Sequence, residues 1–269
     1  MLLQKDNRAW VLFNSALRHA MVNLPVMYSK SLLVNEYPKS GGTWLTKMLS
    51  DLMALPFAKN RLPFITNKQI FHGHYLNYVP IKQVILWRDG RDVVISLYYH
   101  SLFYNDQHNK LLVDHVRRLM PFDDYINIKK NLSVFLETWD EKLCKPNYNW
   151  SDFVDNWHED NKNIQIKYEE LFDKPLDTLG KILDWHDIKK SNENINEIVS
   201  KFSIKNIQNK QRAINPESNS DILSFVRKGG YGGWREIFNH EIAHTFNKIH
   251  GKALIKLGYE NNETWVNNF

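Results

Sequence analysis

Residues 31–44 read Ser-Leu-Leu-Val-Asn-Glu-Tyr-Pro-Lys-Ser-Gly-Gly-Thr-Trp, and they are the most informative segment of the chain. Its apolar start predicts a strand, and the apolar residues that follow, spaced along one helical face, predict a helix just behind the glycines. A tight loop between a strand and a helix N-terminus points backbone N–H groups and the positive helix end into one concavity. Lys39 adds a cation, and Ser40 and Thr43 add hydroxyl donors. The loop is therefore predicted to bind a phosphate or sulfate.

The order of residues in the loop indicates which anion it binds. A Walker A loop places its lysine after the glycines, in the order G-x-x-x-x-G-K-[ST]. Here Lys39 precedes the glycines, and no Walker A motif occurs elsewhere in the chain. The order Tyr-Pro-Lys-Ser-Gly-x-Thr-Trp resembles the 5′-phosphosulfate loop of sulfotransferases that use 3′-phosphoadenosine 5′-phosphosulfate (PAPS). The resemblance implies that these residues hold the donor: Lys39, Ser40, Gly41, Gly42, Thr43 and Trp44.

A second motif follows a buried strand predicted over residues 82–88. It reads Trp-Arg-Asp-Gly-Arg-Asp-Val-Val-Ile-Ser over residues 87–96, and a helix is predicted from about Val93 to Phe103. Ligands of open parallel sheets collect at the carboxyl ends of the strands, so Arg88 and Ser96 are expected to face one nucleotide. The run resembles the 3′-phosphate motif of the same family, in which an Arg and a Ser eight positions later grip that phosphate.

A third motif lies near the C-terminus. Residues 225–235 resemble the R-K-G-x-x-G-D-W-K segment of the family. The resemblance implies that Arg227, Lys228 and Gly229 contact the 3′-phosphate and that the glycines allow a close backbone approach. Gly233 stands where the family has Asp, and Arg235 stands where it has Lys, so this loop is expected to be more flexible than usual.

A further segment, residues 163–171, resembles the family's strand that ends in Tyr-Glu. The resemblance implies that Tyr168 lies near the adenine, and it adds Phe202 to the nucleotide-binding residues. Strands predicted near 31–37, 69–74, 82–88 and 163–168 alternate with helices, which favours a parallel sheet. The expected fold is a single α/β domain over residues 1–269 with a central parallel sheet flanked by helices. Two parts complete this expectation: a helical extension at 1–30 and a covering loop at 205–233.

Composition sets limits on the environment and partners. The chain has 269 residues, 43% of them apolar, and a net charge of +5, which suits an anionic donor. Cys144 is the sole cysteine, so an intrachain disulfide and a cysteine-based zinc site are excluded. Neither a signal peptide nor a run of roughly 20 apolar residues is found. A soluble, cytoplasmic protein without a nucleic-acid partner is expected.

Residues 70–76 read Ile-Phe-His-Gly-His-Tyr-Leu and supply the candidates for a general base. They stand where the family has Lys-Thr-His-Leu-Pro, which puts His74 at the catalytic position and His72 at the family's lysine. Alternation along a strand puts both imidazoles on one face. An imidazole accepts a proton near neutral pH, so His74 is the predicted base and His72 is the alternative.

The resemblance implies in-line transfer of a sulfuryl group from PAPS to a hydroxyl, or less readily to an amine. His74 takes the acceptor proton, and Lys39 stabilises the bridging oxygen as adenosine 3′,5′-bisphosphate (PAP) leaves. Ser96 restrains Lys39 until the acceptor binds, and no metal is required. Residues 104–135 and 205–226 lack strong periodicity and are expected to form the walls or lids around the acceptor. A glycan, a small phenol or alcohol, and a specialised metabolite all remain open as acceptors, and so does the oligomeric state.

Two other classes of function remain open. His240-Glu241-x-x-His244 fits the H-E-x-x-H motif, and His250 stands where metzincin proteases place their third zinc ligand. No methionine follows Met120, so the Met-turn of a zinc metallohydrolase is missing. The other alternative is a non-catalytic domain that binds acidic glycans. The intact Lys39 and the candidate base argue against it.

Overall fold

Two compact units make up the chain. A computed structural model describes residues 8–27, 31–58, 62–64, 68–76, 79–104, 110–143, 147–157, 162–214 and 229–269. The first unit combines Met1–Trp87 with His158–Ile214, and the second combines Arg88–Trp157 with Asn215–Phe269. That the whole chain forms one domain stays a prediction.

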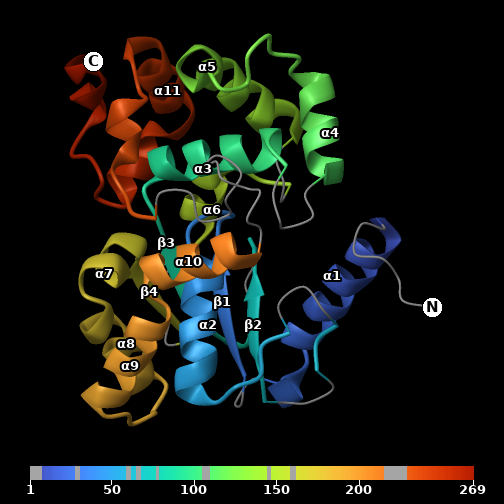
Figure 1. The fold of residues 1–269 in the computed structure, drawn as a ribbon, viewed down its shortest axis with the longest axis vertical. Coiled ribbons are helices and arrows are strands. Elements are labelled where there is room, and N and C mark those ends of the chain that lie inside the picture. The colour runs from blue at the N-terminus through green and yellow to red at the C-terminus, as the bar shows by residue number, and fades with distance from the viewer. Residues whose placement is uncertain are drawn as a thin grey trace. The chain divides into compact units, whose positions relative to one another are not determined.

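The first unit is built on a four-stranded parallel sheet. Its strands are β1 (Leu32–Glu36), β2 (Ile70–Gly73), β3 (Lys82–Trp87) and β4 (Asn163–Lys167). They lie in the order β2-β1-β3-β4, and every neighbouring pair is parallel (Figure 1). The predicted parallel sheet is therefore confirmed, with each strand within two residues of its predicted bounds.

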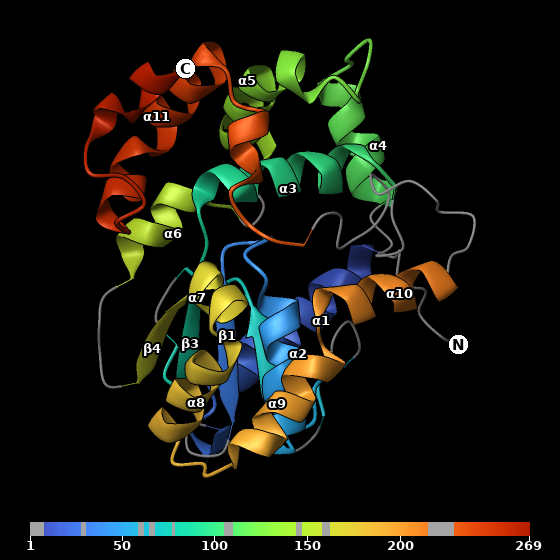
Figure 2. The same ribbon diagram turned by 60° about the vertical axis from the view of Figure 1, so that its left-hand side comes forward.

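Helices cover both faces of this sheet. Alternate residues of β1 point to opposite sides, and the apolar residues on each side pack against helices. Leu32 and Val34 are buried in a core with α2, α8 and α9, which lie on the near side of the strands in Figure 2. Leu33 is buried on the other side, with Val22 of α1 and Met27. The helices of this unit are α1 (Arg8–Val22), η1 (Pro25–Met27), α2 (Gly42–Met53), α7 (Tyr168–Asp173), α8 (Pro175–Trp185), α9 (Asn192–Lys201) and α10 (Ile204–Ile214).

The predicted N-terminal helix packs on the first unit. Val22 is fully buried, and Arg18 donates a hydrogen bond from Nη2 to the carbonyl of Ala58 at 2.7 Å. No helix among the described residues has the length and apolar character needed to cross a membrane.

The second unit is helical among its described residues. Its centre holds a buried arginine: Arg91 pairs with Asp89 at 2.7 Å and with Glu260, and its guanidinium lies 3.7 Å from the Trp234 ring centroid. Such pairing compensates for the loss of hydration around a buried cation. The helices are α3 (Gly90–Leu102), α4 (Lys110–Leu119), α5 (Ile128–Thr138), η2 (Trp139–Leu143), α6 (Trp150–Asn156), η3 (Gly233–Glu236), α11 (His240–Lys256) and η4 (Glu263–Asn268).

One predicted helix boundary is wrong, and two helices were not predicted. Helix α3 begins at Gly90 rather than near Val93, because the Asp89 side chain caps it by accepting the N–H of Arg91 at 2.9 Å. Residues 104–135, in which no strong periodicity was recognised, contain α4 and most of α5 among their described residues, and their role as walls or lids around the acceptor stays a prediction. The covering loop predicted over 205–233 begins inside α10, and its residues 215–228 lie outside the described residues.

Candidate functional site

The loop between β1 and α2 has the backbone shape predicted for an anion site. Lys39 (φ 77°) and Gly41 (φ 103°) both adopt the left-handed conformation. That conformation is costly for a lysine and is typical of functional sites. Gly41 directly precedes α2, so the positive end of the α2 dipole faces this loop. As a glycine, it has no side chain to cap the first backbone N–H groups of the helix.

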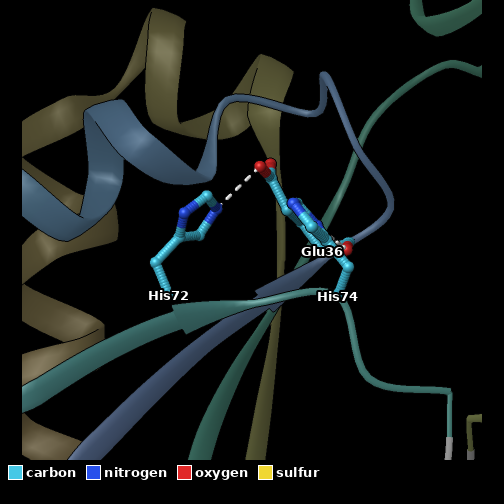
Figure 3. A group of neighbouring side chains, drawn as sticks. All are labelled: Glu36, His72 and His74. Atoms are coloured by element: carbon cyan, nitrogen blue, oxygen red, sulfur yellow. Dashed lines mark hydrogen bonds and ion pairs between the residues drawn. The ribbon is translucent and has the colours of Figure 1, made fainter. Parts of the chain in front are cut away.

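An acidic residue that the sequence analysis did not single out lies under this loop. Glu36 ends β1, is 3% exposed, and accepts the backbone N–H of Gly42 through Oε2. Its other oxygen, Oε1, lies 2.9 Å from Nε2 of His72 (Figure 3). Burial by itself raises the pKa of Glu36, but the hydrogen bond and charge of His72, with smaller effects of His74 and Gly42, bring the pKa below its ordinary value. The carboxylate is therefore ionised at neutral pH.

His74, the predicted base, stands beside Glu36. The sheet register pairs Asn35 with Gly73, so the next residues along, Glu36 and His74, are level with each other. Nδ1 of His74 lies 2.9 Å from the backbone oxygen of Glu36. Because a carbonyl oxygen only accepts, Nδ1 carries the proton and Nε2 keeps a lone pair. Burial is the main reason why the pKa of His74 falls to about 4, so this imidazole is uncharged at neutral pH but a weaker base than the ordinary imidazole expected from the sequence.

His72 and His74 lie next to each other, as alternation along a strand predicted. Their ring centroids are 5.1 Å apart with the rings nearly perpendicular. The two imidazoles differ in their partners. His72 contacts the Glu36 carboxylate, whereas His74 contacts the Glu36 backbone. Which of them acts as the base stays a prediction.

Three aromatic residues predicted to bind the nucleotide come together beside the loop. Tyr168 follows β4 directly and lies 5.8 Å from Trp44, measured between ring centroids. A Cβ atom at Gly41 would lie 2.7 Å from the Tyr168 ring, so the ring packs directly on this glycine. Nε1 of Trp44 donates to the carbonyl of Phe202 at 2.8 Å. The sequence had placed these residues in three separate segments.

The second unit brings together the second and third motifs. Arg88 donates from Nη2 to the carbonyl of Gly230 at 2.8 Å, next to Gly229. Asp92 accepts the N–H groups of Gly232 and Trp234 at 2.6 and 3.2 Å. Asp92 thus fixes the described end of the glycine-rich loop to α3, a role that the sequence analysis missed.

Three other residues predicted for the 3′-phosphate site are either placed differently from the prediction or lie outside the described residues. Ser96 lies in α3, but nearly two turns from its start rather than one, because the helix begins at Gly90. Arg227 and Lys228 lie outside the described residues. Gly229, Gly230 and Gly232 have φ angles of 59°, 145° and 79°, conformations that favour glycine.

The arrangement of α11 does not favour the zinc-hydrolase alternative. His240 and His244 are exposed neighbours with ring centroids 4.2 Å apart. His250 is instead 2% exposed, with Nδ1 2.7 Å from Oγ of Ser151. Within the described residues, the three-residue group with metal-ligand spacing is Glu36, His72 and His74, not the H-E-x-x-H motif.

Comparisons with known proteins identify the family of this chain. A family model described as the sulfotransferase domain matches residues 74–258. Sulfotransferase 1E1 of Mus musculus is 22% identical, over 84% of this chain and 83% of the relative. Cytosolic sulfotransferase 7 of Arabidopsis thaliana is 24% identical, over 75% and 72%.

Solved structures show the same fold. Mouse sulfotransferase SULT7A1 complexed with PAP superposes with a TM-score of 0.62 at 18% identity, covering 96% of this chain and 95% of the other. Retinol dehydratase in a complex with retinol and PAP gives a TM-score of 0.61 at 16% identity, covering 92% and 86%.

Proposed function

Because this chain belongs to the sulfotransferase domain family and is therefore a PAPS-dependent sulfotransferase, we propose that it transfers the sulfuryl group to a hydroxyl with His74 as the general base. One observation carries the choice of base. Nδ1–H of His74 is held by the Glu36 carbonyl, so the lone pair on Nε2 is available beside the loop of Lys39. This is the tautomer that a base needs.

The proposed step balances as an in-line displacement. The bond from sulfur to the bridging phosphate oxygen of PAPS breaks, and a bond from sulfur to the acceptor oxygen forms. The acceptor proton moves to Nε2 of His74. Lys39 stabilises the negative charge that develops on the bridging oxygen as PAP leaves. Positioning and electrostatics supply most of the rate, as in phosphoryl transfer through a loose transition state.

Recognition of the donor is assigned to two groups of residues. Residues 39–44 hold the 5′-phosphosulfate, and Tyr168 and Phe202 lie near the adenine of the nucleotide. Arg88, Ser96 and the Arg227-Lys228-Gly229 segment hold the 3′-phosphate. Support for the second group comes from the bond between Arg88 and Gly230, which joins the two motifs assigned to that phosphate.

The proposed acceptor class is a small molecule with a hydroxyl group. Structures of retinol dehydratase contain retinol in one case and androsterone in another, and both molecules carry a hydroxyl on an apolar skeleton. Acidic glycans form the second class to screen. Incubation of PAPS with pooled acceptors, followed by mass spectrometry of sulfated products, identifies the class directly.

The test of the base compares three single variants at saturating PAPS. Loss of a general base typically costs about 10² to 10⁴ in rate and leaves ligand binding largely intact. His74→Ala is therefore expected to lose at least about a hundredfold in transfer, with PAP affinity by calorimetry unchanged. His244→Ala, which removes an exposed histidine of α11, is the matched control and should transfer normally. A dead His72→Ala variant beside an active His74→Ala variant would reassign the base to His72.

A further inference from the structure

Glu36, His72 and His74 each offer one ligand atom, and these three atoms lie within 4.8 Å of one another. Figure 3 shows the imidazole of His72 directed at the Glu36 carboxylate and His74 beside it. Two imidazoles and a carboxylate form a ligand set typical of zinc and neighbouring transition metals. Two ligands that each lie about 2.0–2.2 Å from a tetrahedral zinc are about 3.3–3.6 Å apart. The widest of the three separations must therefore shrink by no more than about 1.5 Å for the atoms to share one ion.

Supporting hydrogen bonds orient two of the three ligands. Imidazoles that bind metals usually donate their other N–H to a carbonyl or carboxylate, which fixes the ring. His74 does so from Nδ1 to the Glu36 carbonyl at 2.9 Å, leaving Nε2 for a metal. Glu36 is held through Oε2 by the N–H of Gly42, leaving Oε1 for a metal. A metal ion therefore finds these two side chains already oriented.

The third ligand needs one proton to move. His72 Nε2 and Glu36 Oε1 lie 2.9 Å apart and share a hydrogen. A metal ion takes the place of that hydrogen on Nε2, and the neutral imidazole of His72 then carries its single proton on Nδ1. The distance between the two atoms then increases only slightly, because both are bound at about 2.0–2.2 Å.

A glycine leaves the space that this arrangement needs. A Cβ atom at residue 42 would lie 2.5 Å from Cδ of Glu36 and 2.7 Å from Nε2 of His72. Any side chain at this position would therefore push the two ligands apart. Because residue 42 is a glycine, Glu36 and His72 can stay within hydrogen-bonding distance of each other.

We propose that Glu36, His72 and His74 form a binding site for a zinc-class divalent cation, and that the bound cation inhibits sulfuryl transfer. Inhibition follows because the cation occupies the Nε2 lone pair of His74. The inhibitory part rests on the proposed function, whereas the binding part does not. This cation is a reversible inhibitor and is not required for the reaction.

The binding test measures Zn²⁺ and Co²⁺ by calorimetry, with Co²⁺ absorption as a second readout, on untagged protein without donor or acceptor. The exposed pair His240 and His244 stands four residues apart on α11 and is a competing surface site, so the reference protein is the double variant His240→Ala with His244→Ala. One equivalent is expected to bind to this reference. Mg²⁺ should not bind, because it demands oxygen ligands and octahedral geometry.

Three changes in the reference protein then locate the site. Loss of a residue that only supports a metal ligand typically weakens metal binding by about 10–100-fold. His72→Ala and His74→Ala each remove a ligand itself, so each should weaken Zn²⁺ binding by more than this. Gly42→Ala should also weaken it, although all three ligands remain. Thermal melts exclude unfolding, and His72 is the safest site because its side chain is partly exposed. Unchanged binding in both histidine variants, or loss of binding in the reference protein itself, overturns the proposal.

The inhibition test separates this proposal from the proposed function. Zn²⁺ is titrated into the transfer assay of the reference protein and of His72→Ala, with each rate compared with its own metal-free rate. Inhibition of the reference and at least tenfold weaker inhibition of His72→Ala are expected. Zinc binding that requires these histidines in a protein without transfer activity would support the site and refute the proposed function. Transfer that needs His74 but is insensitive to site-bound Zn²⁺ would refute the inhibition.

Discussion

At the scale of single residues, two adjacent glycines of the loop are required for different reasons. Gly41 needs its left-handed backbone and lies against Tyr168. Gly42 is helical, and its constraint is space beside Glu36 and His72. The sequence alone identifies both as loop glycines. It does not separate the two reasons, because Tyr168 and His72 come from distant segments.

The constraint at Gly41 predicts a loss of stability that an ordinary helix glycine does not show. Gly41→Ala places a Cβ 2.7 Å from the Tyr168 ring and holds a side chain in the left-handed region, which costs about 1–2 kcal/mol before any clash. Gly180→Ala in α8 is the matched control, since no atom lies within 4 Å of its added Cβ. That control should raise the free energy of unfolding by up to about 1 kcal/mol. Urea unfolding of both variants checks this, and equal changes in the same direction would refute it.

At the scale of elements, α11 is attached to α6 and η2 through a buried polar cluster. His250 of α11 bonds to Ser151 of α6, and its Nε2 lies 3.6 Å from Asp140 of η2. Burial lowers the pKa of His250 to about 3. Burial, and then the charge of Asp152, raise the pKa of Asp140 to about 7, while a hydrogen bond from Asn149 opposes the rise. Both shifts favour a neutral pair.

The raised pKa of Asp140 predicts how stability changes with pH. Between about pH 4 and pH 7 the folded protein holds a proton on Asp140 that the unfolded chain releases, so this group's contribution to stability falls as pH rises. Asp140→Asn removes the titration and keeps the shape. Its melting temperature minus that of the wild type should therefore increase from pH 4 to pH 7 and then level off. Asp155→Asn, which removes an exposed carboxylate of α6, is the control. A difference that stays flat with pH would contradict the assignment.

The elements show which sequence signals are sufficient. All four strands were predictable because each has its own local pattern, either a short apolar run, as in β1 and β3, or an alternation of polar and apolar residues, as in β4. Helices α4 and α5 were missed, although Val113 and Val116 are buried at helical spacing in α4 and Leu132, Phe135 and Leu136 repeat it in α5. The start of α3 was misplaced because Asp89 caps the helix from a position read as part of a loop.

At the scale of the whole molecule, the motifs predicted the reaction class but not the surroundings of the proposed base, His74. The loop between β1 and α2, the segment around His74 and the Arg88 motif are each a short continuous stretch of sequence. The Glu36–His72 pair is not, because its members are 36 positions apart and meet only through the parallel register of β1 and β2. Contacts set by register cannot be read from a single strand. Asp92 is a similar case, since its partners Gly232 and Trp234 lie 140 and 142 positions away.

Donor binding should change the stability of the folded protein as a whole. A ligand that is present at a hundred times its dissociation constant and binds only the folded state stabilises that state by about 2.7 kcal/mol, so PAP is expected to raise the melting temperature.

Arg88→Ala removes a charged hydrogen-bond donor worth about 1.5–3 kcal/mol, and PAP should then bind at least about tenfold more weakly. The affinity for adenosine 5′-phosphosulfate, which lacks the 3′-phosphate, should barely change. Calorimetry with both nucleotides separates specific loss from general damage, because equal losses would mean that Arg88 acts through its bond to Gly230 and not on the 3′-phosphate.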